Sequence, residues 1–290
     1  MGLLRKVREL FASPAEKEEL KKPIILGENS SFSLTESFRS LKAALSVSVP
    51  RSQGKGLTLL CTSSFPSEGK TTVSVNLAYI FASPRKKVIL VDADLRKGSS
   101  SAMLGLDGKE GLSDFLSGKT KLEDVIIPTG TAENCFIIPR GSKTPRPYDL
   151  LDSYVMKDLL ETLKEQFDYV LIDTPPIQIV PDALALAPQA DGTFLIARHY
   201  VSYENDIKKS VEKLQFFKAN ILGIVVNGYE AQRNSAEYNS SYKYYRYSYH
   251  KHGKYSGGKY NRYYKNYYYS KPNKAEKQEQ KEEKPAEEQK

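Results

Sequence analysis

The chain has 290 residues, a formal net charge of +8 and 40% hydrophobic residues, which is enough for one sizeable folded core. It contains no apolar run of the roughly 20 residues that a transmembrane helix needs. Its first residues lack a signal-peptide core, so we expect a cytoplasmic protein. The two cysteines, Cys61 and Cys135, lie in separate apolar runs without CxxC spacing, which argues against a cysteine metal site and against a disulfide scaffold.

Four segments differ in composition along the chain. Residues 1–29 are expected to be a weakly structured arm, residues 30–228 one folded domain, residues 229–270 a tyrosine-rich tail and residues 271–290 a charged, disordered tail. By count, the three segments from the first residue to 228, from 229 to 270 and from 271 to the end carry charges of +2, +6 and zero. The positive charge therefore belongs to the tyrosine-rich tail and says little about the fold of the domain.

Apolar strand-like runs alternate with helix-length segments in the domain. The predicted strands are 57–62, 87–92, 135–139, 169–173, 193–197 and 221–227. The predicted helices are 70–82, 148–167, 181–187 and 203–219. Apolar strands that alternate with helices indicate a mostly parallel sheet covered by helices on both faces. We therefore predict an α/β fold whose ligands bind at the carboxyl ends of the strands.

A phosphate-binding loop follows the first predicted strand. From Ser63 the sequence reads Ser-Ser-Phe-Pro-Ser-Glu-Gly-Lys-Thr-Thr and leads into a helix, which is the context of a P-loop, although Ser64 stands at the first glycine position. Main-chain N–H groups there would bind phosphates. Lys70 is expected to contact the β- and γ-phosphates, so its replacement should remove activity and leave the fold intact. The predicted cofactor-binding residues are Ser67, Glu68, Gly69, Lys70, Thr71 and Thr72.

Two further strands end in aspartate. One leads into Asp92-Ala93-Asp94-Leu95-Arg96, and the other into Asp173-Thr174-Pro175-Pro176. Carboxylates at the ends of buried strands would lie where Mg²⁺ bound to ATP sits. We therefore predict an ATP–Mg²⁺ site. Its catalytic residues are predicted to be Lys70, Asp92, Asp94 and Asp173, and its metal ligands Thr71, Asp92 and Asp173.

Fourteen of the twenty tyrosines lie between Tyr229 and Tyr269, in a segment with no phenylalanine and almost no aliphatic residue. Such a segment cannot bury enough apolar surface to offset its ordering entropy, so it is predicted to be disordered. A row of phenol hydroxyls downstream of a P-loop suggests phosphoryl transfer to tyrosine. The predicted phosphoacceptors are Tyr244, Tyr245, Tyr263, Tyr264, Tyr267, Tyr268 and Tyr269.

In this order, Pro-x-Glu-Gly-Lys-Thr from Pro66, Asp-x-Asp-x-Arg from Asp92, Asp-Thr-Pro-Pro from Asp173 and the tyrosine cluster resemble the bacterial tyrosine kinases (BY-kinases) of capsule and exopolysaccharide systems. Residues 111–118 resemble a recurrent loop of that family. The resemblance implies a P-loop NTPase fold with three motifs. These are a Walker A with Lys70 and Thr71, a Walker A′ with Asp92 and Asp94, and a Walker B with Asp173.

A shorter segment, Glu36-Ser37-Phe38-Arg39-Ser40-Leu41-Lys42, resembles the oligomerisation motif of the family. The resemblance therefore implies a ring-like homo-oligomer held through Glu36, Arg39 and Lys42. Two positions depart from the family pattern. Ser67 replaces a glycine of many members, and Lys42 replaces an arginine and so lacks the bidentate guanidinium.

The resemblance implies an ATP-dependent tyrosine kinase that autophosphorylates its tail and regulates exopolysaccharide or capsule synthesis and export; transfer in trans is predicted from the reach of the tail. It also implies a separate transmembrane activator of the chain-length-determinant type, a tyrosine phosphatase, and peripheral association with the inner face of the plasma membrane. A flexible tail of about 40 residues would have a root-mean-square reach of roughly 35 Å, which is enough to enter a neighbouring subunit.

The residues leave some alternatives open. A partition-type P-loop ATPase without transferase activity could carry the same motifs and use its basic tail on a membrane or nucleic acid. Specific nucleic-acid binding is not expected, because single-strand binders mount their aromatic residues on a folded platform. The acceptor phenol has an unperturbed pKa near 10, and either Asp92 or Asp94 could take its proton.

Overall fold

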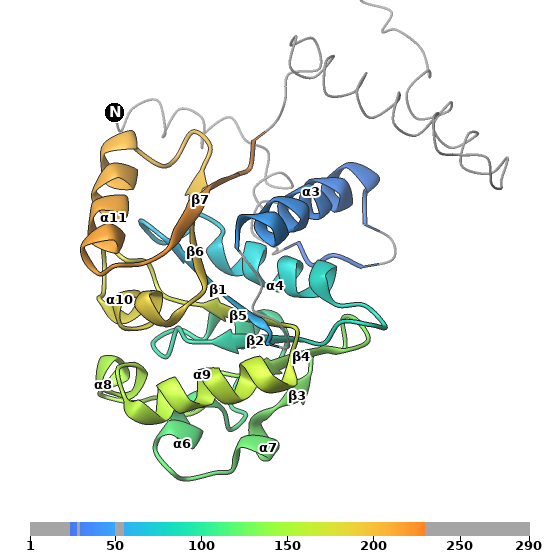
Figure 1. Cartoon of the computed structure of the whole chain (residues 1–290), viewed down its shortest axis with the longest axis vertical. Helices are drawn as coiled ribbons and strands as arrows, with labels where there is room; N and C mark the ends of the chain where they lie inside the picture. Colours follow the sequence, from blue (N-terminus) through green and yellow to red (C-terminus); the bar gives the residue numbers. More distant parts are fainter. Residues whose placement is uncertain (1–23, 28–29, 50–54, 230–290) are drawn as a thin grey trace, which may run out of the picture. The chain divides into compact units, whose positions relative to one another are not determined.

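The computed structural model describes residues 24–27, 30–49 and 55–229, which form a sheet flanked by helices (Figure 1). Residues 1–23 and 28–29 of the predicted arm (1–29), and the two predicted tails from residue 230 onward, lie outside the described residues. The strands are β1 Leu57–Ser63, β2 Val88–Asp92, β3 Ile127–Pro128, β4 Cys135–Ile138, β5 Tyr169–Asp173, β6 Gly192–Arg198 and β7 Ile221–Asn227. The helices are α3 Phe32–Ser48, α4 Lys70–Phe81, α5 Ser99–Met103, α6 Leu112–Leu116, α7 Leu122–Val125, α8 Pro147–Leu151, α9 Tyr154–Gln166, α10 Asp182–Leu186 and α11 Glu204–Phe216, with a 3-10 turn at Ala187–Gln189.

The strands form one sheet in the order β3-β4-β2-β5-β1-β6-β7. Every neighbouring pair is parallel except β3 and β4, which are antiparallel. The mostly parallel α/β fold of a P-loop NTPase is therefore confirmed. The carboxyl ends of β1, β5 and β2 lie side by side, because Cys61 and Asp92 are both register partners of Asp173.

Both faces of the sheet are covered. Alternate residues of a strand point to opposite faces, and Leu59 and Leu60 of β1 accordingly belong to different apolar clusters. One cluster contains residues of α3 and α4, and the other contains residues of α9, α10 and α11. Figure 1 shows α4 and α9 on opposite sides of the sheet. All residues of β1, β2 and β5 are buried, so these strands form a rigid base for the residues at their ends.

The structure departs from the predicted elements at one long helix. Residues 148–167 were expected to form a single helix, but α8 ends at Leu151 and α9 begins at Tyr154. The break occurs because the hydroxyl of Ser153 accepts a hydrogen bond from the main-chain N–H of Met156 and caps the start of α9. The short elements α5, α6, α7 and β3 have too few residues to show a periodic pattern in the sequence.

Candidate active site

The P-loop connects β1 to α4 and contains two residues in the left-handed region of backbone space. Gly69 has a φ of 92° and Ser67 a φ of 67°. A side chain at Gly69 would begin 1.8 Å from Nδ2 of Asn227, so both the dihedral angle and the space require glycine. Ser67, unlike glycine, carries a Cβ, so its left-handed backbone conformation is sterically unfavourable.

A carboxylate inside the P-loop shapes the loop itself. Glu68 is only 2% exposed, and its Oε2 accepts a 2.8 Å hydrogen bond from the main-chain N–H of Phe65. Its Oε1 accepts from the hydroxyl of Ser202, which lies after β6. The side chain of Glu68 therefore stabilises the fold of the loop. Glu68 was predicted to bind the cofactor, but only its main chain remains available to a phosphate.

Two side chains at the ends of β6 and β7 contact the P-loop on the side that faces these strands, which we call its outer side. Nη1 of Arg198 donates to the carbonyl oxygen of Ser67 at 3.0 Å, and Nδ2 of Asn227 donates to that of Glu68 at 3.1 Å. Asn227 ends β7, so the tyrosine-rich tail begins next to the P-loop. At that point the ring of Tyr229 packs edge-on against His199, with 4.9 Å between the ring centroids.

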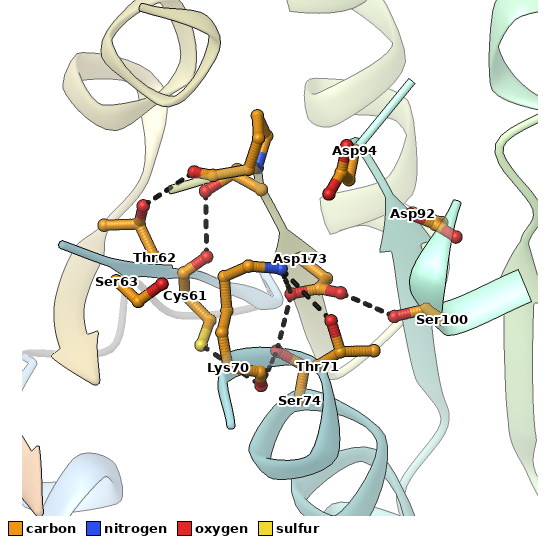
Figure 2. A network of polar contacts seen from close by, with 12 residues as sticks. Cys61, Thr62, Ser63, Lys70, Thr71, Ser74, Asp92, Asp94, Ser100 and Asp173 are labelled. Atoms are coloured by element: carbon orange, nitrogen blue, oxygen red, sulfur yellow. Dashed lines mark hydrogen bonds and ion pairs between the residues drawn. The ribbon is translucent and has the colours of Figure 1, made fainter. Parts of the chain in front are cut away.

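Lys70 lies at the centre of a buried polar network (Figure 2). Its Nζ donates to Oδ1 of Asp173 at 2.8 Å and to the hydroxyl of Thr71 at 3.1 Å. The hydroxyl of Ser74, one turn later on α4, also donates to Oδ1 of Asp173. Burial disfavours the ammonium, but the charge and hydrogen bond of Asp173 prevail and raise the pKa of Lys70. The structure thus brings together Lys70, Thr71 and Asp173 as predicted.

The second acidic motif lies beside this network. Asp92 is fully buried, and burial together with the charge of Asp173 raises its pKa to about 7. Its Oδ1 has no hydrogen-bond partner within the described ranges. Asp94 is also buried, and its Oδ1 accepts from the main-chain N–H of Lys97 at 3.0 Å. Asp94 lies near enough to Lys70 to contribute to the raised pKa of the lysine.

An ion pair fixes the loop that carries the second acidic motif. The guanidinium of Arg96 forms two hydrogen bonds, of 2.8 and 2.9 Å, with the fully buried carboxylate of Asp182 at the start of α10. Such bidentate contacts are directional as well as strong. The loops after β2 and β5, which carry the two acidic motifs, are therefore tied to each other through α10.

Several residues of the site were missed by the sequence analysis. Asn227 could have been found, because it ends a predicted strand at the ligand edge of the sheet. Arg198 and Ser202 follow another predicted strand in the same way. The serines of α4 and α5 gave no usable signal, because a serine next to an acidic motif is common in any loop.

The three predicted oligomerisation residues differ in what they contact: two of them pair with each other on α3, and the third contacts α4. Glu36 and Arg39 form a 2.6 Å ion pair on α3, and the side chain of Arg39 is 60% exposed. Nζ of Lys42 instead donates to the carbonyl oxygen of Ile80 in the chain's own α4, at 2.8 Å. Burial, and then the charge of Arg39, lower the pKa of Lys42. The predicted phosphoacceptor tyrosines lie outside the described residues.

Comparisons with known proteins agree with this architecture. A family model described as an AAA domain matches residues 67–216. The chain is 37% identical over 195 residues to the tyrosine-protein kinase CpsD of Streptococcus pneumoniae serotype 4, a match that covers 66% of this chain and 84% of CpsD. It spans only 26% and 30% of the length of two longer curated tyrosine-protein kinases.

Solved structures show the same relationship. The kinase domain of the Escherichia coli tyrosine kinase ETK is similar with a TM-score of 0.66 and 32% identity, over 72% of this chain and 81% of that domain. The septum site-determining protein MinD of Pyrococcus horikoshii, complexed with Mg-ADP, is similar with a TM-score of 0.53 and 28% identity, over 64% of this chain and 76% of MinD. No helix in the described ranges is long and apolar enough to cross a membrane.

Proposed function

We propose that this chain, which belongs to the family of bacterial tyrosine-protein kinases, transfers the γ-phosphoryl group of ATP to tyrosines of its own C-terminal segment. The observation that carries the proposal is the position of Lys70. Its ammonium lies at the start of the P-loop helix and contacts the buried carboxylate that ends the neighbouring strand. Phosphoryl transfer asks mainly for positioning and charge stabilisation, and this arrangement supplies both.

The residues at this edge suit ATP with Mg²⁺. Magnesium sites with nucleotides commonly use one or two carboxylates together with the phosphates. Oδ1 of buried Asp92 has no partner among the described residues and could bind such an ion. The hydroxyl of Thr71 and the carboxylates of Asp173 and Asp92 would hold the ion. Bound with ATP, Mg²⁺ neutralises charge on the phosphates.

The side chains then have distinct tasks. Lys70 leaves Asp173 to contact the transferred phosphoryl group and stabilises its charge. Asp92 or Asp94 would accept the proton of the acceptor phenol, since both carboxylates are buried beside the Lys70 network. Because Oδ1 of Asp92 is assigned to the ion, Asp94 is the candidate that does not also hold the metal.

We propose that transfer occurs between neighbouring copies, and the place where the tail begins supports this proposal. Because Asn227 contacts the P-loop, each copy in an oligomer presents the root of its tail next to a nucleotide site. The test mixes an inactive Lys70→Met/Asp173→Asn protein with an intact tail and an active protein whose tail tyrosines are phenylalanine. Phosphate is expected on the inactive partner. If that partner stays unmodified in samples shown to contain mixed oligomers, transfer in trans is wrong.

Self-association is proposed to use Glu36 and Arg39, whose pair is available at the surface of α3. Replacing both with alanine should lower the mass seen in sedimentation. Lys42→Ala is the contrasting variant, because Lys42 contacts α4 of its own chain. Its replacement should lower the free energy of unfolding and leave the mass of the oligomer unchanged. Unchanged mass in the double variant would show that this face does not hold the oligomer.

Membership of the family also supports a place in capsule or exopolysaccharide synthesis and export. We propose that the chain works there with a separate transmembrane activator of the chain-length-determinant type, which recruits it to the inner face of the membrane, and with an opposing tyrosine phosphatase. Coexpression with candidate membrane proteins encoded nearby should raise phosphotyrosine on the tail if one of them is the activator.

The similarity to MinD favours one second candidate, a nucleotide-dependent switch that hydrolyses ATP without modifying tyrosine. The two functions separate in one assay. A switch ATPase would release phosphate and leave the tail unmodified after expression in a heterologous host, whereas the kinase would react with an anti-phosphotyrosine antibody.

A further inference from the structure

Two carboxyl groups are buried side by side at the centre of the site. Asp92 and Asp173 are register partners on neighbouring strands, and neither is exposed to solvent. Like charges at such positions repel each other, and burial strengthens the repulsion. Lys70 contacts only one of them directly, through Oδ1 of Asp173. Other contacts must therefore hold the two carboxylates in place.

We infer that two consecutive serines of α5, Ser100 and Ser101, are positioning residues that orient the two carboxylates. The hydroxyl of Ser100 donates to Oδ2 of Asp173 at 2.7 Å. The hydroxyl and the main-chain N–H of Ser101 donate to Oδ2 of Asp92, at 2.6 and 2.7 Å. Both serines are buried, so water does not compete for these bonds. Two neighbouring residues thus serve two neighbouring strand ends.

The orientation of the Ser101 hydroxyl is set by a contact with the segment after β4. The hydroxyl oxygen of Ser101 accepts a 2.9 Å hydrogen bond from the main-chain N–H of Arg140, which follows β4. A hydroxyl has one proton to donate, and with its oxygen already accepting from Arg140 that proton goes to Asp92. The chain of contacts therefore runs from β4 through Ser101 to Asp92 at the end of β2.

A tight turn brings the serines to the carboxylates. The main-chain N–H of Gly98 donates to the carbonyl oxygen of Asp94 at 2.7 Å, and Gly98 has a φ of 64°. A side chain there would begin 2.8 Å from Cδ of Arg140. The acidic motif and the serines are therefore parts of one folded unit.

The serines bind one oxygen of each carboxylate and leave the other for the reaction. Oδ1 of Asp173 accepts from Lys70 and from the hydroxyl of Ser74, and Oδ1 of Asp92 has no partner in the described part of the chain. When Lys70 turns to a phosphate, Ser100 still holds Oδ2 of Asp173, because that bond does not involve the lysine. The carboxylate thus keeps its orientation while its other oxygen becomes available to the ion.

This inference rests on the proposed function for its purpose, but its test uses binding and not catalysis. The affinity of the full-length protein for a fluorescent ADP is measured with Mg²⁺ and with EDTA. The dissociation constant in EDTA divided by the dissociation constant in Mg²⁺ gives the factor by which the ion strengthens binding. Ser100→Ala should lower this ratio about tenfold, because the loss of a hydrogen bond to a buried charge is costly, and should leave the affinity in EDTA within about twofold.

The remaining variants give graded expectations. Ser101→Ala should lower the ratio only about threefold, because the main-chain N–H of residue 101 still holds Asp92. Ser100→Thr retains the hydroxyl and should restore the ratio. Ser99→Ala is the matched control, since Ser99 belongs to the same helix and bonds neither carboxylate, and it should change nothing. Should Ser100→Ala fail to fold, the isosteric Ser100→Cys, a weak donor, takes its place in the same measurement.

Ratios within about twofold of the wild type in folded Ser100→Ala and Ser101→Ala would overturn the inference. So would an equal loss in Ser99→Ala, or a loss of ADP affinity in EDTA as large as that in Mg²⁺. Phosphotyrosine on the wild-type tail together with unchanged ratios would refute the inference alone. Lowered ratios in a protein that never modifies tyrosine would refute the proposed function alone.

Discussion

The two sides of the P-loop are held in different ways. On the side of β5 and β2, buried side chains contact one another, with Lys70 and Asp173 as the central pair. On the side of β6 and β7, Arg198 and Asn227 donate to main-chain carbonyl oxygens of the loop at exposed or partly buried positions. A lost hydrogen bond costs about 0.5–1.5 kcal/mol net, whereas a broken buried ion pair costs about 3–5 kcal/mol.

This difference matches what each side has to do. The acidic side must keep two carboxylates oriented in the protein interior, where charge is unfavourable. Its side chains are therefore buried and hydrogen-bonded to one another. The outer side must let the loop adjust to a nucleotide, and water can replace the contacts that it loses there. Changes on the acidic side should therefore affect stability and activity strongly, and changes on the outer side should act mainly on nucleotide affinity.

The largest effect is expected at the central pair. Lys70→Met should abolish phosphotyrosine formation and also lower the free energy of unfolding by about 3–5 kcal/mol, because it leaves the charge of Asp173 buried without its partner. The double variant Lys70→Met/Asp173→Asn should recover most of the stability and none of the activity. Chemical denaturation and an anti-phosphotyrosine blot measure the two effects. A single variant as stable as the wild type would show that the pair is not formed in solution.

A smaller effect, which depends on pH, is expected at Asp92. Its folded-state pKa of about 7 lies above the ordinary aspartate value of 3.8, so ionising this carboxyl costs the folded state stability. That cost is absent below about pH 4, grows between about pH 4 and 7 and is complete above pH 7. Asp92→Asn should therefore raise the melting temperature at pH 8 in EDTA and have little effect at pH 4.5. An equal shift at both pH values would contradict the raised pKa.

On the outer side, Asn227→Ala and Arg198→Ala should each weaken ADP binding by about two- to tenfold and change the free energy of unfolding by no more than about 1 kcal/mol. Isothermal titration and thermal melts provide the measurements. Losses of stability as large as those of Lys70→Met would mean that the two sides of the loop do not differ.

The smallest effect is expected at Ser67. Because its φ of 67° is unfavourable for a residue with a Cβ, Ser67→Gly should relieve about 1 kcal/mol of strain, partly offset by the greater freedom of glycine in the unfolded chain. The expected result is a melting temperature that is unchanged or a few degrees higher. A clear destabilisation would show that the side chain of Ser67 makes a favourable contact that offsets the strain.

The sequence predicted the sheet, the P-loop and the acidic strand ends because each has a local signature. Apolar runs end in aspartate at Asp92 and Asp173, and Gly-Lys-Thr follows a strand. The partners of these residues depend on register between strands far apart in the chain, so the contacts of Ser100, Ser101 and Asn227 could not be read from local patterns. For the same reason, the buried pairing of Lys70 with Asp173 could not be predicted, so a cost in stability for replacing Lys70 is expected only once the structure is known.

The most direct test of the kinase assignment is to map phosphotyrosine by mass spectrometry after the purified full-length chain is incubated with ATP and Mg²⁺. We predict phosphate on tyrosines within residues 229–270 of the wild type and none in Lys70→Met/Asp173→Asn, which should remain folded. ATP hydrolysis by the wild type without phosphotyrosine, or equal tail phosphorylation in the double variant, would contradict it.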